Sequence, residues 1–383
     1  MARVPHAVEM RSEISLSKVL VVGAGGYFGS LLVRELLEYT DCDVIAAGCS
    51  YKHLSYKLFK FKNSRLSFEV VDLKNSESVE RLLSEAQVAI CAAGPFQNLP
   101  LTLLELCLKK RVHYIDFSDD RQFVKKVHET VNQIADKEYL PAICSGWSTF
   151  PALSGALTRI AVNGLEKADS ITIQMAPGNR SPRAIATVTS LLSSVGSSFS
   201  VWRERHWQNV SGWSGAEPCH FPEPIGQRQG YLVDVPDHEI FPALFDVDSV
   251  EFRVAPEIHF FSQILSLMAW FRGKGFVRNW APYAAVLRKA ASLLGFLGHD
   301  SGAVSVEVLG TKKGIKSRKR VCIITDKEGQ CIPVIPATIM VASLLKNELN
   351  HKGLVPVDDW IEKEDLQREC QKRNYRLIIE ELC

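Results

Sequence analysis

The stretch from Lys18 to Gly29, KVLVVGAGGYFG, constrains the fold of this chain more than any other. Lys18 to Val22 is mostly apolar and predicts a buried strand, and the next seven residues include four glycines. From Tyr27 to Tyr39 the apolar residues recur at helical spacing. A strand, a glycine turn and a helix in this order are typical of the βαβ unit that opens a dinucleotide-binding domain.

The glycines have a physical role in such a unit. They let the backbone approach a pyrophosphate, and the helix that follows directs free N–H groups at the same anion. The spacing is G-x-x-G-x-x-G at Gly23, Gly26 and Gly29, because Phe28 stands where the commoner G-x-G-x-x-G pattern needs glycine. A plain glycine-rich turn is the alternative. The expected cofactor-binding residues here are Gly23, Gly25, Gly26, Tyr27, Phe28 and Gly29.

Strand and helix patterns then alternate through the first third of the chain. Strands are expected over 43–48, 67–71, 87–92, 112–117 and 140–145, with helices over 76–85, 99–109 and 120–135. Alternation with short connections predicts a parallel sheet covered by helices on both faces. The fold class predicted is α/β, a doubly wound Rossmann sheet with a second α+β domain for substrate binding or dimerisation.

Ligands of such sheets bind at the carboxyl ends of the strands. After the second strand an NAD enzyme usually places a carboxylate for the ribose, but the segment from Gly48 to His53 has none. Ser50, Lys52 and His53 instead suit a 2′-phosphate, so we predict NADP as cofactor, with NAD as a possible alternative. The other interpretation is that all three are ordinary loop residues.

Two further segments follow strands of this sheet. Asp72 ends the third strand, where it either approaches the adenine or caps the next helix. After the fourth strand, small residues let the backbone pass close to a cofactor, and a fixed wall beside the nicotinamide is expected there, although a plain Gly-Pro turn is the alternative. The residues assigned to this wall are Ala93, Gly94, Pro95 and Phe96.

The fifth strand offers the candidate catalytic pair. Tyr114 and Asp116 are two residues apart, so both side chains leave the same face of the strand. We predict that they handle a proton beside the nicotinamide. The alternative is that Asp116 or Ser118 only caps the following helix.

These segments, with two later ones, resemble a known family. The glycine turn, Ala93-Gly94-Pro95-Phe96, His113-Tyr114-Ile115-Asp116 and the run from Gly146 to Ser154 look like the marks of saccharopine dehydrogenase-like oxidoreductases. Ile335-Pro336-Ala337-Thr338 and Gly353-Leu354-Val355-Pro356 match the family pattern as well. The resemblance implies NADP-linked chemistry on a carbon–nitrogen bond.

The middle of the chain changes character. Strand patterns over 170–175, 250–254, 304–309 and 320–325, and a helix over 184–196, predict a mixed domain over 149–333. The Rossmann domain is expected to comprise 1–148 plus 334–383, with helices over 337–347 and 360–381. Arg180 and Arg183 precede a helix and suit a substrate carboxylate or phosphate, and His206 lies among tryptophans that are candidates for a substrate pocket. Solvated arginines and core tryptophans are the alternatives.

Residues 258–298 contain two strongly apolar stretches interrupted by basic residues. Neither reaches the roughly 18 uninterrupted apolar residues that a bilayer span needs. We expect helices buried in a domain or homodimer interface, with peripheral membrane contact through a basic-rimmed apolar face as the alternative.

Composition excludes several classes. The 45 Lys and Arg against 43 Asp and Glu give a net charge of only +2, so no nucleic-acid partner is expected. The ten cysteines are scattered without zinc spacing, which predicts free thiols, no metal site and a cytoplasmic protein. The first fifteen residues contain no apolar run long enough for a signal peptide, so none is expected.

The predicted function is that of an NADP-dependent oxidoreductase, transferring hydride to or from a small-molecule substrate. A catalytically silent nucleotide-binding or membrane-associated protein is the alternative, because no obvious general base stands out in the sequence.

Overall fold

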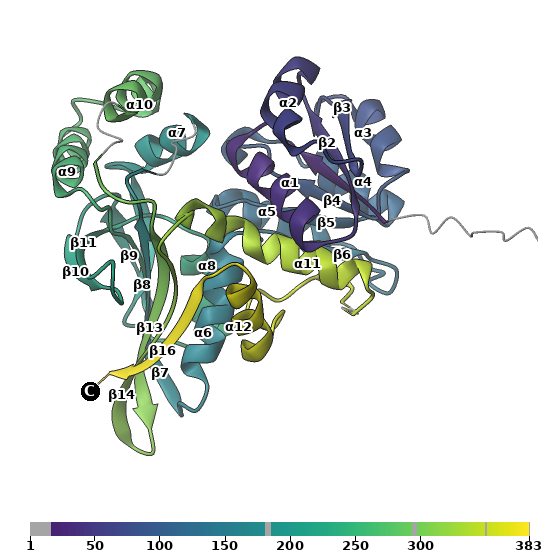
Figure 1. Ribbon diagram of the computed structural model, residues 1–383. Coiled ribbons are helices and arrows are strands. Elements are labelled where there is room, and N and C mark those ends of the chain that lie inside the picture. The colour runs from purple at the N-terminus through teal and green to yellow at the C-terminus, as the bar shows by residue number, and fades with distance from the viewer. Residues whose placement is uncertain (1–16, 181–184, 293–296, 349–350, 383) are drawn as a thin grey trace, which may run out of the picture.

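The computed structural model describes residues 17–180, 185–292, 297–348 and 351–382, and shows two sheet-based domains joined by several helices (Figure 1). One hydrophobic core of buried residues runs continuously from the first sheet into the second. The two domains therefore share their packing at the junction where the chain passes between them.

The first domain is the predicted Rossmann sheet. Its seven strands are all parallel and lie in the order β15-β6-β5-β4-β1-β2-β3. The strands are β1 (Lys18–Val22), β2 (Asp43–Gly48), β3 (Leu66–Val70), β4 (Val88–Cys91), β5 (His113–Asp116), β6 (Ala142–Cys144) and β15 (Gly353–Leu354). Helices α1 (Tyr27–Tyr39), α2 (Tyr51–Leu58), α3 (Ser76–Leu83), α4 (Thr102–Lys110) and α5 (Arg121–Asn132) connect them. The predicted fold class is confirmed, and element ends differ from the predicted ones by a few residues.

The second domain is built on a larger mixed sheet. Its main path runs β10-β11-β12-β7-β13-β14-β16, and β8 with β9 attaches beside β12. The strands are β7 (Lys167–Pro177), β8 (Ser198–Arg203), β9 (His206–Ser211), β10 (Glu217–His220), β11 (Gln227–Leu232), β12 (Ser249–Val254), β13 (Gly302–Lys312), β14 (Ile315–Thr325) and β16 (Arg376–Leu382). Only β7 and β12 pair in parallel, so most of the sheet consists of antiparallel neighbours.

Helices fill the junction between the sheets. α6 (Ser154–Val162) packs against β13 and β14, and α8 (Asp237–Leu244) packs against β12. α11 (Ile335–Leu345) contacts α1 and has apolar residues around most of its circumference, which explains why it is buried on nearly every side. In Figure 1 it runs between the first sheet and the second domain.

The last part of the chain corrects one prediction. A short helix α12 (Lys363–Lys372) forms inside the expected helix over 360–381, but residues 376–382 form β16 and pair with β14 of the second sheet. Leu377, Ile378 and Ile379 are β-formers that pack against this sheet, and this tertiary contact overrides the helical pattern. The chain thus returns to the first domain at β15, as expected, and then leaves it again.

Three helices gather at the upper end of the second domain in Figure 1: α7 (Ile185–Ser194), α9 (His259–Gly273) and α10 (Ala284–Ser292). α9 and α10 lie within the apolar segment 258–298. None of the helices in the described residues is long and apolar enough to cross a membrane.

Candidate functional site

The turn between β1 and α1 has the geometry of an anion cradle. Gly23 has φ +84°, its N–H donates to the Ala47 carbonyl of β2, and its own carbonyl accepts from Gly26 N–H at 2.8 Å. Gly26 is the exposed N-cap of α1, and among the described residues no side chain caps this helix and no acid lies in its first turn. The positive end of α1 is therefore open to a phosphate.

Two of the glycines are required by close packing. A Cβ at position 23 would lie 2.7 Å from the Ala93 N atom, and one at position 29 would lie 2.2 Å from the Gly23 O atom. Gly26 has more space, since its nearest neighbour would be the Gly23 O atom at 3.0 Å. The tight packing of the turn thus requires glycine at positions 23 and 29. Glycine at position 26 leaves the surface next to the N-terminus of α1 free of a side chain. Tyr27 and Phe28 contribute backbone N–H groups here, because the Tyr27 hydroxyl is buried and Phe28 packs against the core.

The end of β2 presents polar groups beside this turn. Ser50 is the N-cap of α2 and accepts from His53 N–H, while Lys52 is exposed in the first turn. The His53 ring reaches back over the glycine turn, with Nε2 at 3.0 Å from the Gly25 carbonyl O atom. A helix N-terminus with Ser, Lys and His at the end of β2 is suited to a 2′-phosphate.

Asp72 is exposed at the carboxyl end of β3. Its Oδ1 accepts from Lys74 N–H at 2.9 Å and forms a local turn. The N-cap of α3 is instead Asn75, whose side chain accepts from Glu77 and Ser78 N–H. The alternative prediction that Asp72 caps this helix is therefore wrong, and an adenine contact stays a prediction.

The loop after β4 lies directly under the glycine turn, because Ala93 packs against Gly23. Gly94 and Pro95 are exposed and joined by a cis peptide bond. The Phe96 ring is only 8% exposed and contacts Phe123 edge-on at 5.1 Å between centroids. Gly94 and Pro95 can thus border a ligand, whereas the Phe96 ring packs into the first domain.

The predicted catalytic pair meets as expected but is buried. Tyr114 and Asp116 share a hydrogen bond at β5, and their side chains have 1% and 0% exposure. The Asp116 carboxylate also accepts from Ser118 N–H, Ser145 Oγ and Gly146 N–H, at 2.9, 2.7 and 2.8 Å. The next helix, α5, is capped by Asp120, so the capping alternative for Asp116 and Ser118 is wrong.

Burial raises the pKa of Asp116, and these four hydrogen bonds act in the opposite direction. Burial, with the neighbouring Asp116 charge, raises the pKa of Tyr114 well above its ordinary value. The buried Asp116 carboxylate therefore links the end of β5 to the Ser145–Gly146 turn through hydrogen bonds. This turn begins the crossing into the second domain.

Sequence reasoning missed the residues that follow. Asp119 lies just beyond the carboxyl end of β5. Its side chain is exposed at the surface, yet desolvation by the surrounding protein atoms raises its pKa to about 6. Arg121, two residues later, pairs with Asp234 of the second domain at 2.5 Å and donates to the Ser200 carbonyl. Their position directly after a parallel strand was the available signal.

Buried polar groups of α6 and α8, both in the second domain, lie near this contact. Ser154 Oγ donates to Asp237, and burial raises the pKa of Asp237 to about 7. His238 is fully buried, its Nε2 accepts from Phe252 N–H, and its Nδ1 lies 3.5 Å from Asp234. These contacts fasten α8 to α6 and to β12 within the second domain.

The residues expected to bind substrate are dispersed. Arg180 follows β7, and its backbone N–H donates to the His299 carbonyl. His206 is exposed on β9, with Nε2 at 2.8 Å from the Gln208 amide, away from the β5 edge contacts. Arg183 lies outside the described residues.

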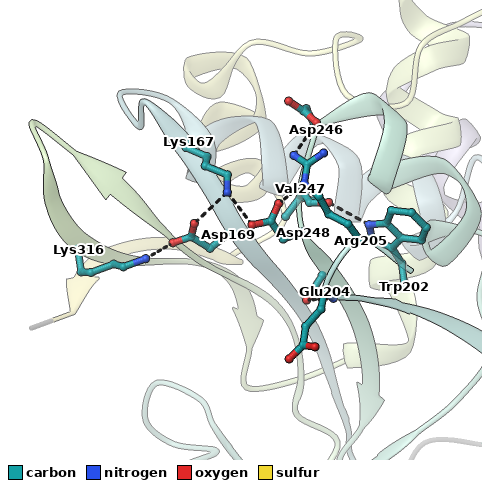
Figure 2. Close-up of polar contacts among 10 residues, drawn as sticks. Lys167, Asp169, Trp202, Glu204, Arg205, Asp246, Val247, Asp248 and Lys316 are labelled. Carbon is teal, nitrogen blue, oxygen red and sulfur yellow. Dashed lines mark hydrogen bonds and ion pairs between the residues drawn. The ribbon is translucent and has the colours of Figure 1, made fainter. Parts of the chain in front are cut away.

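Charges elsewhere in the second domain are paired with one another. In Figure 2 Lys167 bridges Asp248 at 2.6 Å and Asp169 at 3.7 Å, and Lys316 pairs with Asp169 at 2.7 Å. Arg205 joins the other end through Asp248 and Asp246. This set, which we name the outer ion network, holds the β8–β9 turn, where Glu204 and Arg205 both have positive φ. It braces strand ends and presents no unpaired carboxylate comparable to Asp119.

The residues at the first sheet fit a dinucleotide phosphate. The open N-terminus of α1, the exposed Gly26 and the polar start of α2 all lie at the carboxyl ends of β1 and β2. Within the described part of the chain, no group of three or more His, Cys, Asp or Glu residues is placed to hold a metal ion.

Comparison with known families agrees with this geometry. Residues 19–139 match the saccharopine dehydrogenase NADP-binding domain. A saccharopine dehydrogenase (L-Glu forming) from Saccharomyces cerevisiae has the same overall fold, with a TM-score of 0.69 over 96% of this chain and all of that chain. Its identity of 10% limits this likeness to the fold.

Two curated relatives align over about a third of their length. A saccharopine dehydrogenase-like oxidoreductase of Homo sapiens is 28% identical over 166 residues, 38% of either chain. A lipid droplet localized protein of Caenorhabditis elegans is 23% identical over 145 residues, 35% of this chain and 34% of the relative. The family resemblance is confirmed, and residues 19–139 of this chain form a saccharopine dehydrogenase-type domain that binds NADP(H).

Proposed function

We propose that this protein is an NADP-dependent oxidoreductase that transfers hydride to or from a small-molecule substrate. The observation that carries the proposal is the uncapped N-terminus of α1 behind the glycine turn, together with the carboxylate-free end of β2. Bound NADP(H) would supply or accept the hydride, and the residues of this chain would hold its phosphates and shape the space beside it.

The proton-handling group proposed is Asp119. It is accessible at the carboxyl edge of β5, and a pKa of about 6 keeps it close to the range in which a general acid or base works at neutral pH. Tyr114 and Asp116, predicted as the catalytic pair, are proposed to act by positioning. Their buried hydrogen bonds order the chain on either side of Asp119 and the Ser145–Gly146 turn.

The substrate class proposed is a compound with a carbon–nitrogen bond, in keeping with the family resemblance. Arg180, and Arg183 beside it in the sequence, are the proposed anchors for a substrate carboxylate, because guanidinium groups bind carboxylates in a bidentate way. His206 stays a weaker proposal, since its side chain is exposed on β9 and bonded to Gln208.

Location and assembly are proposed as cytoplasmic and homodimeric. The nine cysteines in the described residues are all free thiols, which supports a reducing compartment. Nothing in the fold itself selects a particular two-fold partner, so gel filtration with light scattering is the direct measurement of assembly.

The test of the main proposal has two steps. NADPH binding is measured by fluorescence titration, and turnover is then followed at the NADPH absorbance band with oxo acids offered together with ammonia or amino acids. We expect binding tighter than that of NADH, and turnover with at least one carbonyl–amine pair. Tight binding without turnover across the panel would favour the catalytically silent alternative, and tighter NADH binding would contradict the cofactor assignment.

A further inference from the structure

The outer side of α9 is an exposed apolar face. Phe260, Ile264, Leu267, Trp270 and Phe271 recur at helical spacing on one side of the helix, and each is more than a third exposed. Phe276 lies beyond the end of the helix, is 70% exposed, and has its ring centroid 5.9 Å from that of Phe271. We name these six residues the aromatic face. An exposed apolar patch of this kind marks a contact surface.

The segment that carries this face has an unusual charge. Between Ile258 and Gly298 the sequence contains five basic residues and no Asp or Glu. Arg272 is used internally, since its guanidinium donates to the Ser193 and Val195 carbonyls. The other four, Lys274, Arg278, Arg288 and Lys289, are exposed. The face therefore combines exposed aromatic side chains with positive charge alone.

The segment that follows α9, with Lys274 and Arg278, is tied to the helix that carries the aromatic face. Trp280 Nε1 donates to the Met268 carbonyl at 3.0 Å, which fixes the segment after Phe276 to α9. Lys274 lies 6.0 Å from the centre of the Trp270 ring. In Figure 1 α9 and α10 lie at the upper left, and α10 packs against α7, which lies nearer to the first domain.

We propose that the aromatic face and its basic neighbours dock this protein on an anionic phospholipid surface. Helices that lie in the plane of a membrane interface bury Trp, Phe and Leu at the headgroup boundary and hold Lys and Arg beside them. Anionic lipids attract basic residues next to such a surface. Both requirements are met by one short segment of the second domain.

The same charges argue against a second copy of this chain as the occupant. A two-fold interface places identical patches against each other. In this segment that arrangement would bring basic residues against basic residues, without one carboxylate of the segment to neutralise them. A phospholipid surface supplies the missing negative charge.

A groove beside the face is consistent with lipid. A cavity of about 500 Å³ opens between α9 and the β9–β11 region, lined by Trp213, Tyr231, Ala269, Trp270 and Lys274 among others. The Trp213 and Tyr231 rings stack with centroids 5.2 Å apart and form an apolar wall. Its volume lies in the range of small-ligand sites, and Trp270 of the aromatic face is one of its lining residues.

The test is flotation of the full chain with vesicles of phosphatidylcholine alone or with phosphatidylglycerol added. We expect flotation with the anionic vesicles, weak flotation with neutral ones, and release at high salt, since about 1 M salt shortens the screening length to about 3 Å. Phe276→Glu should lower vesicle binding roughly tenfold or more, because it removes one exposed aromatic side chain that the membrane interface would bury. Arg278→Glu should lower it at least roughly fivefold.

Matched controls separate this effect from general changes. Ile315→Glu alters an equally exposed apolar side chain at the β13–β14 turn, and Lys137→Glu alters an exposed lysine of the first domain. Both should float as the unaltered protein does. NADPH binding, measured on the same samples, should be unchanged in all four variants, so failure of the docking proposal is distinct from failure of the proposed function.

Three results would overturn the proposal. They are absence of flotation with anionic vesicles, equal flotation of Phe276→Glu and Ile315→Glu, or a solution dimer that Phe276→Glu converts to monomer without any vesicle binding. The last result would assign the aromatic face to a second copy of the chain.

Discussion

The carboxyl edge of the first sheet and the outer ion network use similar residues in opposite ways. In the network, Lys167, Asp248 and Arg205 pair with one another, and the hydrogen bond with Lys167 lowers the pKa of Asp248. At the sheet edge, the first turn of α1 has no side-chain cap, and the pKa of Asp119 is raised. The charges of the network form ion pairs and stabilise strand ends. The uncapped end of α1 and the exposed carboxylate of Asp119 are instead accessible to a ligand.

A third arrangement lies between these two. Asp116 is at the same edge as Asp119, yet its carboxylate is buried and fully hydrogen-bonded. Position at the end of a strand is therefore insufficient to identify a catalytic group. Exposure at the surface separates Asp119 from Asp116, which is buried.

The largest effect is expected from Asp119→Asn. If Asp119 transfers the proton, turnover should fall by about 10²–10⁴ while NADPH affinity stays the same. In the direction that needs a proton donor, kcat/KM of the unaltered protein should fall as pH rises through about 6, because the carboxyl loses its proton there. This limb of the pH profile should disappear in the variant.

The matched control is Asp120→Asn. Asp120 is the N-cap of α5, and Asn caps a helix about as well as Asp. Turnover of this variant should be close to that of the unaltered protein. Equal turnover of the two variants would remove Asp119 from the mechanism.

Gly26→Ala tests the open end of α1. The added methyl group would stand in front of the first N–H groups, and loss of a helix-terminus interaction of up to ~2 kcal/mol should weaken NADPH binding roughly thirtyfold. Gly273→Ala, where a Cβ would meet no atom within 4 Å, is the control for the loss of a glycine. NADPH affinity that is unaltered in Gly26→Ala would place the phosphates elsewhere.

Asp116→Ala tests the buried carboxylate. It leaves the Ser145 hydroxyl and the Ser118 and Gly146 N–H groups without their acceptor, so the free energy of unfolding should fall by about 3 kcal/mol. Urea unfolding measures the change. A variant that is as stable as the unaltered protein, but loses turnover, would restore Asp116 as a catalytic candidate.

The smallest effect is expected in the outer ion network. Asp248→Ala removes the shared acceptor of Lys167 and Arg205, but exposed ion pairs contribute little and are screened by salt. The unfolding midpoint should move by no more than about 2 °C, and less at high salt. A large loss of stability would show that the network has a greater role than its exposure suggests.

Much of the first domain could be predicted from its sequence. Its strands have short, apolar, β-branched cores, and α1 follows a glycine turn whose packing leaves no room for a side chain at Gly23. Local pattern and tertiary structure agree there. The sequence pattern also predicts that Gly94 and Pro95 lie at the edge of the sheet. It does not predict that the Phe96 ring packs inward against Phe123.

The second domain and the site were less predictable for a physical reason. β16 pairs with β14, a strand that is distant in sequence, so the local pattern over 360–381 predicts a helix where the structure has a strand. The contact of Arg121 with Asp234 likewise joins residues from separate domains. Burial of Asp116 depends on the Ser145–Gly146 turn, which alternation along β5 does not reveal.

The pairing of β15 with β6 limits how this protein can be divided for experiments. A fragment ending near residue 148 would leave the β6 strand as an open sheet edge, and it would expose the surface of α1 that α11 contacts in the whole chain. Open edges and uncovered apolar faces lead to aggregation through pairing with other chains. Binding studies of the first domain are therefore best made on the full chain, or on a fragment to which residues 335–357 are rejoined by a linker.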